Sequence, residues 1–106
     1  MKNKTAPDRT EVSELRIYTD NDSDLYNRLV LPIVKAMKER LDAHTYDANL
    51  GIRPFLKVVE ESAKRYTAQY CSKGDKWYEI FSLPVRTEVA NQMQTYFLDE
   101  IQEGNY

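Results

Sequence analysis

The chain has very few of the residues from which metal and redox sites are built. Its 106 residues include one cysteine and one histidine, Cys71 and His44. Zinc sites in proteins take three or four Cys, His or carboxylate ligands, so these two residues alone cannot form one. A single cysteine cannot form an internal disulfide either, which is typical of proteins from a reducing compartment. We therefore expect neither a zinc centre nor a disulfide framework.

Other catalytic patterns are also lacking. Cys71 and His44 are far apart in sequence, and nothing nearby indicates a nucleophile paired with a base. The three glycines are too scattered to form a phosphate-binding loop. The acidic stretch 20–24 begins like a calcium loop, but Leu25 and Leu31 stand where that loop needs glycine and glutamate. We predict a protein that is not an enzyme and holds no cofactor.

No apolar run approaches the roughly 20 residues of a membrane-spanning helix. The basic N-terminus, residues 1–5, is not followed by the apolar stretch of a secretory signal. Hydrophobic residues make up 42% of the chain and charged residues 30%, a balance typical of folded, soluble domains. The length fits one domain. We expect one cytoplasmic domain without a membrane contact.

A first apolar stripe predicts a helix over about residues 22–43. Asp22 or Ser23 can cap its start, because their side chains accept hydrogen bonds from the free N–H groups of the first turn. Pro32 removes one hydrogen bond, and we expect it to kink the helix while the stripe keeps its phase. Apolar residues recur every fourth position: Leu25, Leu29, Ile33, Met37 and Leu41.

Two further stripes predict helices over about 48–72 and 83–103. Asp47 is a suitable cap for the former, and Pro54 suits a first turn. Gly74 suits the left-handed turn that follows, and a short helical turn is expected near 76–81. The fold class is therefore mainly all-α, a compact bundle of three major helices formed by residues 21–106.

Residues 1–20 are expected to form a flexible or extended N-terminal arm. Leu15, Ile17 and Thr19 alternate with polar residues, a spacing typical of a strand. A lone strand needs a partner, so this arm could mediate a homodimer. Tyr18 and Tyr106 lie outside the helical stripes and are expected to be exposed.

Charge is distributed unevenly along the chain. Residues 28–86 hold eleven Lys and Arg against seven Asp and Glu, whereas residues 87–106 hold four acids and no base. Basic and aromatic residues interleave near Gly74, a mixture that can hold phosphates and stack bases or anchor a protein interface. The same aromatic residues could instead fill the end of the bundle while the lysines solvate the loop. The candidate partner-binding residues are Arg65, Lys73, Lys76, Trp77, Tyr78 and Arg86.

Several short blocks carry a resemblance to other proteins. They are Leu31-Pro32-Ile33, Thr45-Tyr46-Asp47, Ala63-Lys64-Arg65-Tyr66, Lys73-Gly74-Asp75-Lys76-Trp77-Tyr78 and Val85-Arg86-Thr87-Glu88-Val89-Ala90. From Leu25 to Met93 the chain resembles small, functionally uncharacterised helical proteins of bacteriophages and prophages. The resemblance implies the cytoplasm of a bacterial host and a role in binding a host or viral protein, including components of host defence.

Two functional hypotheses follow. The first is a non-enzymatic phage-type protein that acts by binding another protein. The alternative is a nucleic-acid-binding accessory protein that uses the basic–aromatic segment 65–86.

Overall fold

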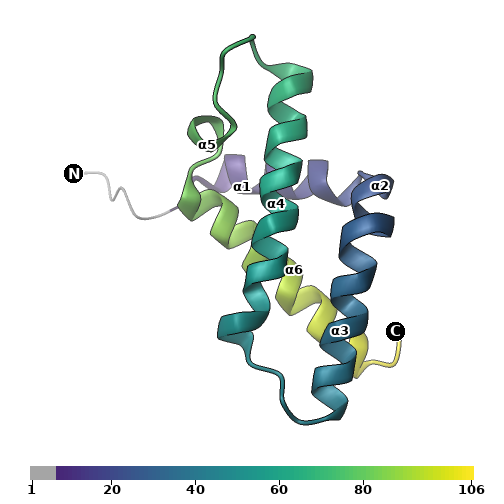
Figure 1. Ribbon diagram of the computed structural model, residues 1–106. Helices are drawn as coiled ribbons and strands as arrows, with labels where there is room; N and C mark the ends of the chain where they lie inside the picture. Colours follow the sequence, from purple (N-terminus) through teal and green to yellow (C-terminus); the bar gives the residue numbers. More distant parts are fainter. Residues whose placement is uncertain (1–6) are drawn as a thin grey trace, which may run out of the picture.

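The computed structural model describes residues 7–106 and contains helices but no strand within them, which confirms the all-α class. In chain order the elements are α1 (Arg9–Asp20), α2 (Ser23–Leu25), the π-helical segment η1 (Tyr26–Val30), α3 (Leu31–Asp42), α4 (Ala48–Tyr70), α5 (Trp77–Ile80) and α6 (Leu83–Gln102). The two longest helices, α4 and α6, cross and share the most extensive contact (Figure 1). None of the described helices is long and apolar enough to cross a membrane.

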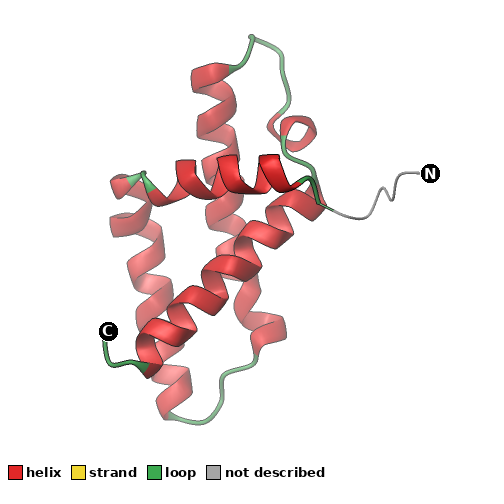
Figure 2. Ribbon diagram, turned by 180° about the vertical axis from the view of Figure 1, so that it is seen from behind, coloured by secondary structure: helices red, strands yellow, loops and turns green. Residues whose placement is uncertain are grey.

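The N-terminal arm is the main correction to the predicted fold, because residues 9–20 form a helix. Val12, Leu15 and Thr19 are buried, and their spacing of three and four is helical, whereas Ile17 points outward and is 60% exposed. The Asp8 side chain caps the helix by accepting the N–H of Glu11. Figure 2 shows α1 lying across α4 and α6. Residues 1–6 of the predicted arm lie outside the described residues.

The prediction of a homodimer formed through the N-terminal arm assumed an exposed strand, and residues 9–20 form a helix instead. Leu15 is fully buried within its own chain and belongs to the same hydrophobic core as α4 and α6. A residue in that position cannot pair as an exposed strand with a second chain. The core therefore includes α1 as well as the three predicted helices.

Pro32 is accommodated without a break. The segment Tyr26–Val30, which ends two residues before Pro32, is π-helical, and the N–H of Leu31 donates to the carbonyl of Tyr26. A π-helical turn contains one extra residue, so it rotates the following residues around the helix axis. The predicted stripe consequently loses its phase: the fully buried positions are Leu25, Val30, Val34 and Met37, while Leu29, Ile33 and Leu41 are only partly buried.

The α4 helix begins at the predicted position, Ala48. The Asp47 side chain accepts the N–H of Asn49 at 2.9 Å, which confirms Asp47 as the cap and places Pro54 inside the helix rather than in its first turn. The helix ends at Tyr70, and Gly74 adopts a φ of +99°, the left-handed turn that its position predicted. The short turn α5 and the long α6 lie where they were expected.

Tyr106 was predicted to be exposed, but it is partly buried. Its hydroxyl lies 2.7 Å from that of Tyr26, and its ring meets Phe97 edge-on at 5.8 Å between centroids. The end of the described chain is therefore packed against η1 and α6.

Candidate functional site

Trp77 and Arg86, two of the predicted binding residues, lie together at one end of the bundle. The Arg86 guanidinium is 4.8 Å from the centre of the Trp77 ring, and the Lys64 ammonium is 5.4 Å from it. Arg86 Nε also donates to the carbonyl of Phe81 at 2.9 Å, and burial lowers the pKa of Arg86. Trp77 packs against the core. These two side chains therefore interact with each other and with the fold.

Arg65 lies in a different environment from Trp77. Its guanidinium forms ion pairs with Asp22 at 2.9 Å, with Asp24 at 2.8 Å and with Glu61 at 3.3 Å. These hydrogen bonds to carboxylates, that to Asp24 above all, raise the pKa of Arg65. Arg65 thus fastens α2 to α4, and three of its donors are already used.

Lys73, Lys76 and Tyr78 are the exposed members of the predicted cluster. Lys73 and Lys76 lie in the connection between α4 and α5, and Tyr78, on α5, is 49% exposed. The carboxylate of Asp75 lies in the same connection and accepts the N–H of Ser72 at 2.8 Å. The positive charge of this turn is therefore partly offset within the turn itself.

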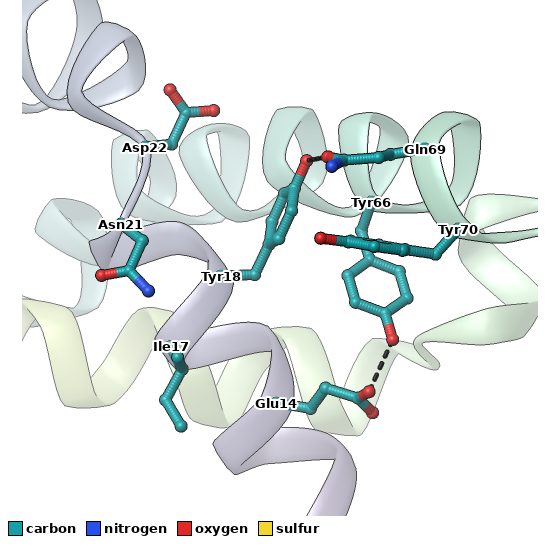
Figure 3. Close-up of a pocket in the computed structure, with 8 residues that line it drawn as sticks. All are labelled: Glu14, Ile17, Tyr18, Asn21, Asp22, Tyr66, Gln69 and Tyr70. Atoms are coloured by element: carbon teal, nitrogen blue, oxygen red, sulfur yellow. Dashed lines mark hydrogen bonds between the residues drawn. The ribbon is translucent and has the colours of Figure 1, made fainter.

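A second surface, which we term the tyrosine groove, lies between α1 and α4 (Figure 3). Its volume is about 670 Å³, within the range of ligand-binding clefts. Tyr66 and Tyr70 are four residues apart on α4 and therefore share one helix face, which Tyr18 of α1 approaches. The groove is lined by Glu14, Ile17, Tyr18, Asn21, Asp22, Tyr66, Gln69 and Tyr70.

The three tyrosine rings form a cluster. Tyr18 meets Tyr66 edge-on with 5.3 Å between centroids and Tyr70 edge-on with 6.0 Å, and Tyr66 lies 5.0 Å from Tyr70. Tyr66 also packs edge-on against the buried Phe81 at 4.9 Å. Such pairs stabilise beyond the area that they bury. The groove wall is therefore anchored to the core through Tyr66.

Two hydrogen bonds hold this wall in place. The Tyr18 hydroxyl donates to Gln69 Oε1 at 2.8 Å, and the Tyr66 hydroxyl donates to Glu14 Oε1 at 2.5 Å. The bond to Glu14 raises the pKa of Tyr66 to about 12, with burial as the second cause. Burial and the charge of Asp22 raise the pKa of Tyr18. Both hydroxyls are consequently protonated at neutral pH.

The rim of the groove exposes apolar surface. Tyr70 and Ile17 are 62% and 60% exposed and are the most exposed large hydrophobic residues in the described chain. They lie on opposite sides of the groove, Ile17 on α1 and Tyr70 on α4 (Figure 3). Glu14, on α1, and Asp22, in the connection that follows α1, carry carboxylates on either side of Ile17 and Tyr18 along the chain.

Sequence reasoning missed this groove because three of its eight lining residues, Glu14, Ile17 and Tyr18, come from the segment predicted as an extended arm. The helical spacing of Val12, Leu15 and Thr19 was the signal that could have revealed it.

Within residues 7–106, no group of three His, Cys, Asp or Glu side chains is placed to hold a metal ion. Comparison of the chain with protein-family models, curated proteins and solved structures finds no match. The site must therefore be interpreted from its own geometry.

Proposed function

We propose that this protein is a non-enzymatic binding protein that holds a segment of a partner protein in the tyrosine groove. The observation that supports this is the pairing of Ile17 and Tyr70, two largely exposed apolar side chains, across one groove. Exposed apolar surface gathered at one place is typical of interaction sites. Tyrosine is also enriched among the residues that dominate binding energy at protein interfaces.

The groove suits a protein segment better than a small reactive substrate. Two of its tyrosine hydroxyls are engaged in hydrogen bonds to Gln69 and Glu14, so they fix the wall rather than serve as free acids or bases. An anchored aromatic wall costs little conformational entropy when a partner binds. A partner side chain can therefore pack against a surface that is already ordered.

The test is a selection from a random peptide library, with the full chain as target. We expect enriched peptides whose affinity falls about tenfold or more in Tyr70→Ala, since truncating a hot-spot residue costs about 2 kcal/mol. Tyr78→Ala is the matched control, because Tyr78 is also an exposed tyrosine but lies on α5. A library that yields no peptide above background, or peptides that Tyr70→Ala binds as well as the original chain, would contradict the proposal.

The identity of the partner is a separate part of the proposal. The resemblance to phage and prophage proteins supports a bacterial host or defence protein as partner and the host cytoplasm as the location. Replication, lysis or defence genes next to this gene in its genome would support that context, and a gene set unrelated to mobile elements would contradict it.

Nucleic-acid binding is the second candidate, supported by the joint exposure of Lys73, Lys76 and Tyr78. Trp77 and Arg86 support it less, because they are engaged with each other. Binding to phosphates should weaken steeply as salt rises. Electrophoretic shifts of single- and double-stranded oligonucleotides at low salt test it: shifts lost in Lys73→Ala would support this function, and flat titrations would exclude it.

A further inference from the structure

The tyrosine groove combines aromatic rings with a carboxylate, which is a combination that attracts cations. We propose that the groove receives the side chain of an arginine or lysine from the partner segment. This inference rests on the proposed function and specifies the chemistry of what the groove binds.

The carboxylate of Glu14 is the main electrostatic feature. Its Oε1 accepts the Tyr66 hydroxyl at 2.5 Å, a bond that fixes the carboxylate beside the groove (Figure 3). A carboxylate has about four acceptor sites, so this bond leaves capacity for a further donor. Within residues 7–106, none of the ion pairs involves Glu14. Its charge is thus available to a cation from outside.

The opposite end of the groove is also acidic. Asp22 pairs with Arg65, but the same guanidinium serves Asp24 and Glu61 as well. Asp24 also pairs with Arg28 at 3.0 Å, so three carboxylates face two cations there and the excess charge is negative. An acidic or phosphorylated segment would be repelled from both ends, whereas a basic one is attracted.

The walls of the groove suit both the charged group and the apolar stem of a long basic side chain. Aromatic faces attract ammonium and guanidinium groups, most strongly where water is partly excluded, and Tyr70 offers an exposed ring. Lysine and arginine also carry apolar stems that pack along hydrophobic surface. Ile17, on the α1 side, provides such a surface beside the rings.

The experiment is an NMR titration with two peptides, acetyl-Gly-Arg-Gly-amide and the same peptide with citrulline, which has nearly the shape of arginine but no charge. We expect the arginine peptide to shift the amide signals of Ile17, Tyr18 and Tyr70, and the citrulline peptide to shift them much less. The shifts should shrink as salt is added, because screening weakens exposed charge pairs.

Variants separate the two contributions. Glu14→Gln should weaken arginine binding roughly two- to fivefold, the range expected for a partly exposed charge pair. Glu39→Gln, an exposed glutamate on α3, is the matched control and should change nothing. Tyr70→Leu removes the aromatic ring but keeps an apolar side chain, so it tests whether the ring itself contributes to arginine binding. An unchanged signal pattern outside the groove shows that each variant is folded.

Equal shifts with both peptides, no shifts with either, or full binding by Glu14→Gln would each overturn the cation site. Failure of this inference differs from failure of the proposed function. Library peptides that depend on Tyr70 but lack Lys and Arg would overturn only the cation site. Arginine-dependent shifts in a protein that selects no peptide would overturn only the protein-binding function.

Discussion

Thr19 on α1 and Ser62 on α4 share a buried hydrogen bond, with 2.7 Å between their hydroxyl oxygens. Thr19 Oγ1 also donates to the carbonyl of Leu15 at 2.7 Å, so its only hydrogen is used there and Ser62 is the donor across the helices. The bond joins α1 to α4 at a point where the small residues Ser62 and Ala63 are fully buried.

This arrangement predicts an unequal effect of removing either hydroxyl. Thr19→Val leaves the buried Ser62 hydroxyl without an acceptor and should lower the free energy of unfolding by about 1–3 kcal/mol. Ser62→Ala leaves Thr19 bonded to Leu15 and should cost about 1 kcal/mol. Urea unfolding measures both, with the exposed Ser13→Ala on α1 as control. A greater loss in Ser62→Ala than in Thr19→Val would contradict the assigned donor.

Gly51 makes room for the side chain of Tyr46, whose hydroxyl donates to Gln94 Oε1 on α6. A Cβ at Gly51 would overlap the Tyr46 hydroxyl and lie 2.9 Å from Gln94 Oε1. Alanine normally favours a helix over glycine by about 1 kcal/mol, but overpacking of this kind costs about 1–3 kcal/mol. Gly51→Ala should therefore destabilise the protein in thermal or urea unfolding.

A second background isolates the cause of that effect. In Tyr46→Leu, which removes the overlapping ring end, Gly51→Ala should become neutral or stabilising. If Gly51→Ala has the same effect in both backgrounds, the close approach of Tyr46 is not what requires glycine.

The raised pKa of Tyr66 predicts a loss of stability at alkaline pH. The group ionises near its ordinary value of 10.0 in the unfolded chain and at about 12 in the fold. Its contribution is therefore fully present below pH 10 and is lost as the pH rises through 12. Unfolding free energy should fall over this interval, and less steeply in Tyr66→Phe. Tyr78→Phe on α5 serves as control, and equal slopes in Tyr66→Phe and the original chain would contradict the prediction.

The ion pairs of Arg65 predict an effect at acidic pH. Its hydrogen bond to Asp24 lowers the pKa of that carboxyl below 3.8, so the associated stability is present above pH 3.8 and is lost as the pH falls through the lower value. Arg65→Met should lower the unfolding free energy near neutral pH, and the difference from the original chain should narrow in acid. Lys57→Met, an exposed change on the same helix, is the control. A difference that does not depend on pH would contradict this assignment.

The local features that the sequence predicted correctly are those that neighbouring residues decide. The Asp47 side chain caps α4 because the N–H groups it satisfies follow it directly. Gly74 takes the left-handed conformation because it has no Cβ to resist it. The apolar stripe of α6 predicted the buried positions correctly, because Val85, Val89 and Met93 recur at helical spacing.

The segments that it predicted wrongly depend on distant residues. Leu15 and Ile17 fit a strand as well as a helix over so short a stretch, and it is the packing of Leu15 and Thr19 against the core that separates the two. Pro32 predicted a distortion of the helix. It did not predict that the π-helical segment η1 would turn Val30 and Val34 into the core.

By itself, then, the sequence determined that this chain is helical, where α4 and α6 lie, and which caps and turns bound them, because these depend on contacts within a few residues. Only the tertiary structure decided that α1 lies against α4 and that Arg65 pairs with three carboxylates. It also decided that Glu14 and Tyr66, far apart in sequence, meet beside one groove. Such pairings depend on how helices pack, and no local pattern encodes them.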